Sequence, residues 1–258
     1  MNELSVGIIQ SNLHWENPEA NRDMLEAKIS SFEPDTNLVV LPEMFTTGFS
    51  MNALELAEKK EGTTLEWMRS IASNQDIAVT GSLIVREKRK FYNRLYFVFP
   101  DGSYHWYDKK HTFTLAGEHR TYAAGKEKLI IDFHGWKICP LICYDLRFPV
   151  WSRNTEDYDL LIYVANWPKK RISAWDALLR ARAIENMSYC IGVNRIGVDG
   201  NNHEYIGHSA VYNVLGDLIS NSDNEIEFTE KVVLSKDHIL NTRKQLQFLN
   251  DRDAFSLI

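Results

Sequence analysis

Short apolar runs and longer amphipathic stretches alternate along the chain. The apolar runs are too short for typical helices and are rich in β-branched and aromatic residues, so they predict strands. The predicted strands are 4–10, 37–41, 77–85, 91–99, 103–107, 128–133, 136–143, 160–164, 189–194, 209–214, 217–220 and 225–234. Between them, apolar residues recur at helical spacing, as from residue 17, near residue 63, from residue 173 and from residue 235. Strands that alternate with helices are typical of an α/β protein.

Capping signals mark where these helices begin. Asn17 is followed by a proline and a glutamate, which suit the first turn of a helix. Thr63 or Thr64 is expected to cap the next helix. Ser173, with Asp176 three residues later, has the spacing of a capping box.

Composition and charge narrow the class of protein. The 258 residues are 44% hydrophobic and 25% charged, which predicts one ordinary globular domain spanning residues 1–258. A net charge of -6 argues against a nucleic-acid or anionic-membrane partner, because those partners require a dense basic surface. No apolar run approaches the roughly 20 residues that span a bilayer. We therefore expect a cytoplasmic protein with a small-molecule partner.

The cysteines do not form a metal-binding pattern. Cys139, Cys143 and Cys190 are an odd number of thiols in a long chain, and none lies in a Cys/His cluster with zinc-like spacing. We expect reduced thiols and neither a metal nor another cofactor.

One of these thiols lies where a predicted strand ends. In residues 136–151, WKICPLICYDLRFPVW, an apolar run stops at Cys143 and is followed by charged residues and a proline. Open α/β sheets place their chemistry at the carboxyl ends of strands. A nucleophile in such a turn would have an exposed side chain, and the next backbone N–H, that of Tyr144, could donate to an oxyanion. The alternative is a buried apolar cysteine with no catalytic role.

A glutamate occupies the same kind of position. The strand 37–41 stops at Pro42, so Glu43 lies just past its carboxyl end. The flanking residues, LP and MFTTGF, are apolar enough to bury the side chain, and a buried carboxylate makes a useful proton shuttle. A solvated loop glutamate is the alternative.

Two adjacent lysines follow the strand 103–107. If its alternation continues, Trp106, Asp108 and Lys110 lie on one face and Lys109 on the other, with Tyr107. The pattern does not decide which face is inward, and a solvated basic turn explains it equally well.

Two further segments suit the edge of a site. Residues 114–125 are polar and contain glycine, as expected of a loop over a site, and they include Glu118. The strand 160–164 leads into Asn166 and Trp167, so a third strand end carries polar and aromatic side chains.

Together these motifs resemble those of the nitrilase, or carbon–nitrogen hydrolase, superfamily. The motifs are LPEMF at Glu43, DKKHTF at Lys109 and ICYDLRFPVWSRN at Cys143, and the likeness continues through NWP at Asn166. The resemblance covers nearly the whole chain, and the three motifs in this order are strongly specific as a set. The sequence looks most like the bacterial ω-amidase branch. The family's K-x-H pattern favours Lys109 over Lys110.

The resemblance also implies an architecture and a substrate class. It implies a four-layer α-β-β-α sandwich and a homodimer. It implies small ω-amides of 2-oxo dicarboxylic acids, such as 2-oxoglutaramate and 2-oxosuccinamate, as substrates. The family's second glutamate falls on Glu118 by position and loop context. Thr112 is a departure, since relatives often have leucine there, and it concerns the substrate pocket rather than the chemistry.

Amide hydrolysis assigns a role to each of these residues. A thiol has a pKa of about 8.5, so Cys143 needs a base as it attacks the amide carbon. Glu43 would take that proton, give it to the departing ammonia and then activate water against the thioester. Lys109 and the Tyr144 N–H would hold the oxyanion, and Glu118 would hold Lys109.

Assignments for the substrate pocket follow from the same resemblance. Arg147 could bind a substrate carboxylate as a fork, or it could balance the neighbouring Asp145. Phe113 and Trp167 are further candidates for contact with the substrate. An amidase for another carboxylate-bearing amide, such as a deaminated-peptide amide, is an alternative. A thioester-forming N-acyltransferase and a non-catalytic binding module also remain open.

Overall fold

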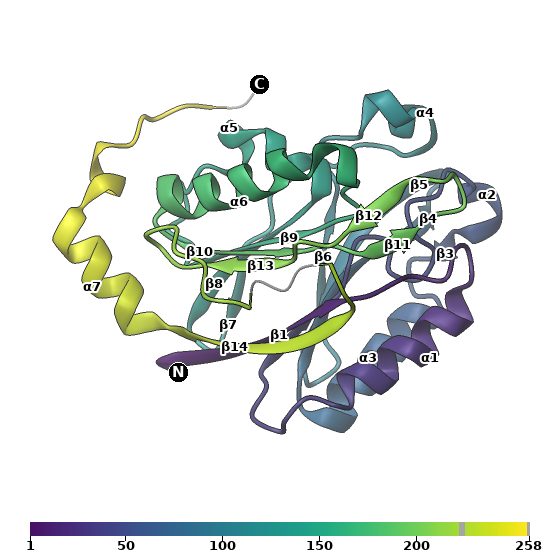
Figure 1. The fold of residues 1–258 in the computed structure, drawn as a ribbon, viewed down its shortest axis with the longest axis horizontal. Helices are drawn as coiled ribbons and strands as arrows, with labels where there is room; N and C mark the ends of the chain where they lie inside the picture. The colour runs from purple at the N-terminus through teal and green to yellow at the C-terminus, as the bar shows by residue number, and fades with distance from the viewer. Residues whose placement is uncertain (222–224, 257–258) are drawn as a thin grey trace.

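The computed structural model describes residues 1–221 and 225–256. Two β-sheets lie face to face, and helices cover their outer sides (Figure 1). α1 and α3 pack outside one sheet, and α5 and α6 pack outside the other (Figure 1). The α-β-β-α sandwich predicted from the sequence is therefore confirmed.

The first sheet has the strand order β14-β1-β2-β4-β5-β6, and β3 also pairs with β4. Its strands are β1 (Glu3–Gln10), β2 (Leu38–Val40), β3 (Glu58–Lys59), β4 (Ala78–Glu87), β5 (Lys90–Val98), β6 (Tyr104–Asp108) and β14 (Phe228–Ser235). β1, β2 and β4 pair in parallel, whereas β14, β5 and β6 join antiparallel.

The second sheet has the order β13-β10-β9-β8-β7. Its strands are β7 (Ile131–Phe133), β8 (Trp136–Ile142), β9 (Leu160–Val164), β10 (Tyr189–Val193) and β13 (Ala210–Tyr212). β8, β9 and β10 are parallel, and the two edge strands are antiparallel. A separate hairpin is formed by β11 (Ile196–Val198) and β12 (Glu204–Ile206).

Helices connect and cover these sheets. The α-helices are α1 (Pro18–Ile29), α2 (Ala53–Leu56), α3 (Thr63–Gln75), α4 (Glu118–Thr121), α5 (Pro149–Ser152), α6 (Ile172–Asn186) and α7 (Lys236–Leu246). The 3₁₀ helices are η1 (Thr114–Ala116), η2 (Cys143–Arg147), η3 (Lys169–Arg171) and η4 (Phe248–Asp251). Within residues 1–221 and 225–256, no helix has both the length and the hydropathy needed to cross a bilayer.

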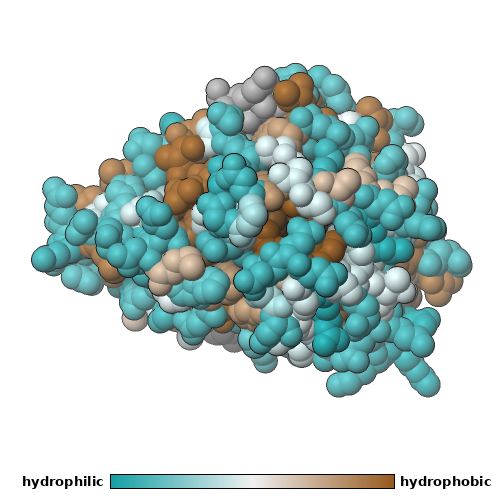
Figure 2. Space-filling model, turned by 90° about the horizontal axis from the view of Figure 1, so that it is seen from below, coloured by the Kyte–Doolittle hydropathy of each residue, from teal (hydrophilic) through white to brown (hydrophobic). Residues whose placement is uncertain are grey.

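Apolar side chains on alternate faces of the strands hold the layers together. In β2, Leu38 and Val40 join the cluster between the two sheets, whereas Val39 joins the cluster under α1 and α3. A strand covered on both faces is apolar at every position, which explains the continuous apolar runs of the sequence. Polar residues predominate on the face shown in Figure 2, where hydrophobic side chains lie in separate patches. The two apolar clusters hold the parallel strands at the centre of each sheet in place. The carboxyl ends of these strands border the candidate active site described below.

Several predicted helix starts need correction. Asn17 caps α1 as predicted, and its Oδ1 accepts from the Ala20 N–H at 3.2 Å. Neither predicted threonine caps α3. Gly62 is the N-cap there, and Glu58 accepts from the Thr64 N–H at 2.7 Å. The Ser173 capping box is also wrong, because α6 already begins at Ile172.

Other differences concern strands and loops. The predicted strand 217–220 is reduced to an isolated bridge between Tyr212 and Leu218. In the turn between them, Asn213 Oδ1 accepts from the Leu215 and Asp217 N–H groups. The predicted strand 225–234 begins only at Phe228. The predicted loop 114–125 contains η1 and α4, and the hairpin β11–β12 was not predicted at all.

The helix starts lead to a stability test. Asn17→Ala should lower the free energy of unfolding by about 1 kcal/mol, because a helix N–H loses its side-chain acceptor. Ser173→Ala is the control. It replaces an exposed residue inside α6 by a better helix former, so stability should stay constant or rise slightly. Urea denaturation measures the free energy of unfolding of both variants. An equal loss of stability in the two would contradict the assignment of Asn17 as the cap of α1.

Candidate active site

Residues that follow four strands meet between the two sheets. Glu43 follows β2 and Lys109 follows β6 in the first sheet, whereas Cys143 follows β8 and Asn166 follows β9 in the second. β8 and β9 are parallel neighbours, so their carboxyl ends lie at one edge. The site is therefore assembled from both sheets.

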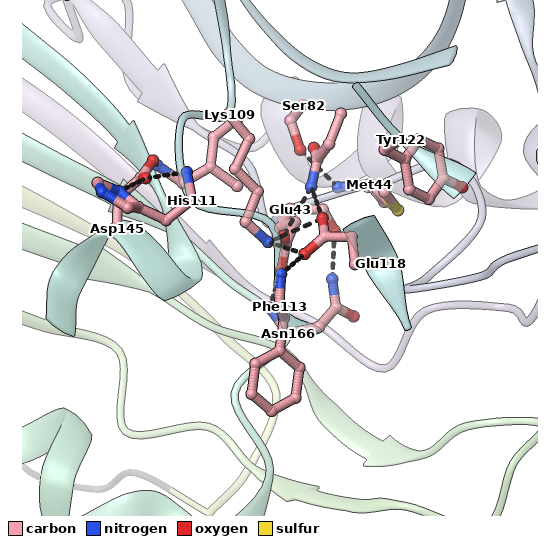
Figure 3. Close-up of polar contacts among 12 residues, drawn as sticks. Glu43, Met44, Ser82, Lys109, His111, Phe113, Glu118, Tyr122, Asp145 and Asn166 are labelled. Atoms are coloured by element: carbon pink, nitrogen blue, oxygen red, sulfur yellow. Dashed lines mark hydrogen bonds and ion pairs between the residues drawn. The ribbon is translucent and has the colours of Figure 1, made fainter. Parts of the chain in front are cut away.

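Glu43 is completely buried and held on both carboxylate oxygens. Its Oε1 accepts from Lys109 Nζ and from Asn93 Nδ2, each at 2.8 Å. Its Oε2 accepts from the backbone N–H of Asn166 at 2.8 Å (Figure 3). The Asn166 side chain also donates to the Glu43 carbonyl at 2.6 Å. These contacts fix the carboxylate and stabilise its negative charge, and they exclude a solvated loop glutamate.

Lys109 lies between two carboxylates. Its Nζ is 2.8 Å from Glu43 Oε1 and 3.0 Å from both carboxylate oxygens of Glu118 (Figure 3). Burial lowers the pKa of this ammonium, but the charges of Glu118 and Glu43 outweigh burial and raise the pKa well above its usual value. Lys109 therefore carries a permanent positive charge inside the site.

The strand register decides between the two lysines. Tyr107 and Lys109 are each only 1% exposed, whereas Trp106 on the opposite face is 40% exposed. The Lys110 ammonium instead lies 5.2 Å from the ring centroid of Trp151. The inward face thus carries Lys109, as the K-x-H pattern predicted.

Glu118 lies at the start of α4 and is completely buried. Besides Lys109, its carboxylate accepts from the backbone N–H of Phe113 and from Asn93 at 3.4 Å. Burial raises its pKa, and the nearby charge of Glu43 acts in the same direction, while Lys109 opposes both. The structure therefore places Glu118 against Lys109, where the resemblance had placed it.

Cys143 is the first residue of η2 and has a positive φ of 43°. Such a backbone conformation is sparsely populated for residues other than glycine and is typical of a nucleophile at a sharp strand-to-helix turn. Its side chain is 9% exposed, which is less than predicted for a turn of this kind. The Tyr144 N–H belongs to the first turn of η2, where helix geometry supplies no partner. Its oxyanion role stays a prediction.

The electrostatic surroundings keep the Cys143 thiol protonated at rest. Burial raises its pKa well above the usual value, the Glu43 charge raises it further, and only Lys109 opposes them. A hydrogen bond between the thiol and the Glu43 carboxylate raises the pKa of Cys143 in the same direction. A base is therefore in place to take the proton as the sulfur attacks.

A cavity of about 570 Å³ opens above the thiol. All three residues predicted to contact substrate line it, namely Arg147, Phe113 and Trp167. The Arg147 guanidinium lies 4.9 Å from the ring centroid of Trp167. In the described residues it forms no ion pair with Asp145, so the structural alternative for Arg147 is wrong.

Sequence reasoning missed two side chains at this site. Asn93 lies inside β5 and bridges Glu43 and Glu118, and its only signal was a polar residue within an apolar run. Arg171 was not among the predicted site residues. It lines the cavity, and its guanidinium lies 5.0 Å from the ring centroid of Phe113. Nothing in its local sequence distinguished Arg171 from neighbouring lysines.

Neither arginine of the cavity has a carboxylate partner among the residues that the structure describes. Lys169, two residues before Arg171, does pair with Glu204 at 2.7 Å. Arg147 and Arg171 therefore offer unpaired guanidinium donors to a ligand. Over residues 1–221 and 225–256, no three His, Cys, Asp or Glu side chains are grouped to hold a metal ion.

Fold and site define an amidase-type hydrolase that depends on a cysteine. The family model for carbon–nitrogen hydrolases matches residues 5–236, and the chain belongs to this family. This match and the relatives described next confirm the assignment to the nitrilase superfamily and its ω-amidase branch.

The matches to relatives cover most or all of the chain. The chain is 41% identical over 258 residues to the omega-amidase YafV of Yersinia enterocolitica, covering 100% of both chains. It is 32% identical over 226 residues to a 2-oxoglutaramate amidase of Bacillus subtilis, covering 86% of this chain and 87% of the relative. It superposes with a TM-score of 0.97 on XC1258 from Xanthomonas campestris, a CN-hydrolase superfamily protein with an arsenic adduct in its active site. That match is 41% identical and covers 100% of both chains.

The register of the two lysines can be tested directly. Lys109→Ala should lower kcat about a hundredfold to a thousandfold, because a buried ammonium aimed at an oxyanion contributes roughly 3 to 4 kcal/mol. Lys110→Ala is the matched control and should be nearly normal, since that ammonium lies outside the cavity lining. Lys109→Arg should also fail, because the planar guanidinium is larger than an ammonium. Steady-state rates of the three variants with 2-oxosuccinamate measure these effects. An inactive Lys110→Ala beside an active Lys109→Ala would refute the assignment of Lys109 to the inward face.

Proposed function

We propose that this chain is a cysteine-dependent ω-amidase that releases ammonia from small ω-amides of 2-oxo dicarboxylic acids. The observation that carries the proposal is the buried Glu43–Lys109–Glu118 cluster beside Cys143, at the floor of a cavity with two unpaired arginines. The names of the relatives, omega-amidase and 2-oxoglutaramate amidase, support the same substrate class.

The first half of the reaction forms an acyl-enzyme. The Cys143 sulfur attacks the amide carbon while Glu43 takes the thiol proton. The carbonyl oxygen becomes an oxyanion, which the Lys109 ammonium and the Tyr144 N–H stabilise. Glu43 then returns the proton to the amide nitrogen, the carbon–nitrogen bond breaks, and ammonia leaves behind a thioester on Cys143.

The second half consumes water. Glu43 takes a proton from a water molecule, whose oxygen attacks the thioester carbon through a second oxyanion at the same place. The carbon–sulfur bond breaks, the proton returns to the Cys143 sulfur, and the free acid departs. Glu118 takes no proton in this scheme. It holds Lys109 in place through both carboxylate oxygens. Without Glu118 the ammonium would be held by Glu43 alone and could turn away from the reacting carbon.

The cavity wall supplies a carboxylate site. Arg147 and Arg171 each lie over an aromatic ring, of Trp167 and Phe113 respectively, and such stacking holds a guanidinium plane while leaving its N–H groups free. The two arginines are further coupled, since Trp167 Nε1 donates to the Arg171 carbonyl at 2.8 Å. We assign the carboxylate of the substrate to these two groups, with the ω-amide directed at Cys143.

Assembly and location are proposals of the same kind. The family resemblance supports a homodimer, which would sediment at about twice the chain mass of 29.9 kDa. A sedimentation mass equal to a single chain would exclude it. Composition and charge support a cytoplasmic enzyme of one domain, which cell fractionation would test.

The nucleophile is tested by comparing the three cysteines. Cys143→Ala should lower the release of ammonia and free acid at least a thousandfold while the protein stays folded. Cys139→Ala and Cys190→Ala should keep most activity, because both thiols lie in the core, where burial raises the pKa of Cys139 to about 12. The assay contains no added amine. Substantial activity in Cys143→Ala would exclude this mechanism, and wild-type enzyme that yields no free acid would favour acyl transfer.

The carboxylate site is tested by selectivity. Arg147→Ala and Arg171→Ala should each raise KM for 2-oxoglutaramate about tenfold to a hundredfold, because a hydrogen bond to a charged group contributes about 1.5–3 kcal/mol. Hydrolysis of butyramide, which has no carboxylate, should change little. Arg180→Ala is the control, since Arg180 also stacks on an aromatic ring, that of Tyr212, but lies outside the cavity lining. Equal losses with both amides would rule out carboxylate recognition by these arginines.

A further inference from the structure

The DLR segment after Cys143 contains a carboxylate that the reaction scheme does not use. Asp145 is completely buried and accepts on both oxygens. Its Oδ2 accepts from the Ile142 N–H at 3.1 Å and from the Tyr107 hydroxyl at 2.8 Å. Its Oδ1 accepts from the His111 N–H at 3.0 Å and lies 2.8 Å from His111 Nδ1 (Figure 3).

These partners belong to the two segments that carry the reacting groups. Ile142 is the residue before Cys143, at the end of β8 in the second sheet. Tyr107 and His111 lie two residues before and two residues after Lys109, which follows β6 at the edge of the first sheet. Asp145 thus joins the nucleophile turn directly to the lysine segment, across the boundary between the two sheets.

Tyr107 extends this connection. While its hydroxyl donates to Asp145, its oxygen accepts from the Lys110 N–H at 3.1 Å and from Trp151 Nε1 at 3.0 Å. His111 is held as well, because its ring stacks on Phe148 with centroids 3.7 Å apart. The backbone on the carboxyl side of Lys109 is therefore fixed to η2 and α5 at several points.

We propose that Asp145 is a positioning residue that sets the place of the Lys109 ammonium relative to the Cys143 thiol. It touches neither the substrate nor the reacting atoms, and the inference rests on the ω-amidase mechanism proposed above. A misplacement of about 1 Å between reacting groups can cost a hundredfold in rate. Glu43 and Glu118 orient the lysine side chain, whereas Asp145 positions the backbone that bears it.

Only a carboxylate satisfies this arrangement. Each oxygen of Asp145 faces one backbone N–H, that of Ile142 or that of His111. In Asp145→Asn the amide NH₂ must take one of these two places, so one backbone N–H faces another donor in either orientation. The variant has nearly the same shape but breaks the link on one side.

The substrate site should survive this change. Arg182 Nη2 donates to the Leu146 carbonyl at 2.6 Å, which holds the second half of η2 from α6. Arg147 directly follows Leu146, so this contact with α6 also helps to hold Arg147 in place. A loss of the Asp145 link should therefore lower kcat, while KM for a carboxylate-bearing amide changes little.

The test compares two buried aspartates. Asp145→Asn should lower kcat for 2-oxosuccinamate about a hundredfold with KM within about threefold of wild type. It should also slow the alkylation of Cys143 by iodoacetamide about tenfold, since the sulfur loses the aligned Lys109 charge that favours its thiolate. Asp159→Asn is the control. Asp159 is 3% exposed and accepts from the Lys137 N–H at 2.9 Å at the start of β8, so this variant should lose thermal stability but keep kcat.

The outcomes are distinct. A kcat for Asp145→Asn no lower than that of Asp159→Asn, or an unchanged or faster alkylation of Cys143, would overturn the positioning role. If Asp145→Asn does not fold, Tyr107→Phe decides, because it removes one of the four contacts and should lower kcat about fivefold to tenfold with constant KM. A wild-type enzyme without amide turnover would count against the ω-amidase function alone, because the alkylation rates still test the positioning of Lys109.

Discussion

The site depends on a single buried ammonium that compensates two buried carboxylates. Burial and the nearby charge of Glu43 raise the pKa of Glu118, and the Lys109 ammonium between the two carboxylates opposes both effects. One cation does not neutralise two anions. The remaining charge is offset by donors from Asn93, the Asn166 backbone and the Phe113 backbone. These donors come from three different segments, so the cluster requires the complete fold.

The same arrangement explains how a weakly acidic thiol can react. Burial and the Glu43 charge keep Cys143 protonated in the resting state, and that protects it from ionising without substrate. The proton leaves only when it can move to Glu43, and Lys109 then balances the charge that appears on the carbonyl oxygen. A strained φ at Cys143 and the buried link through Asp145 keep these groups at a fixed separation.

The architecture provides the place where this chemistry occurs. Parallel strands at the centre of both sheets direct their carboxyl ends toward one region, so turns that are distant in sequence meet there. Residue 43 and residue 166 are joined by two hydrogen bonds although they follow strands of different sheets. The antiparallel edge strand β6 adds the lysine.

Local pattern determined the strands and the positions of Glu43 and Cys143, because apolar runs that end abruptly mark strand ends wherever they occur. Family motifs then selected Lys109 and Glu118. Pattern alone left the two lysines open, because alternation defines two faces of a strand and only packing against the second sheet makes one of them inward. It also missed Asn93, Arg171 and the role of Asp145, whose partners lie up to 50 residues away in sequence or in a ligand cavity. Contacts at that range leave no local periodicity, so only the tertiary structure could decide them.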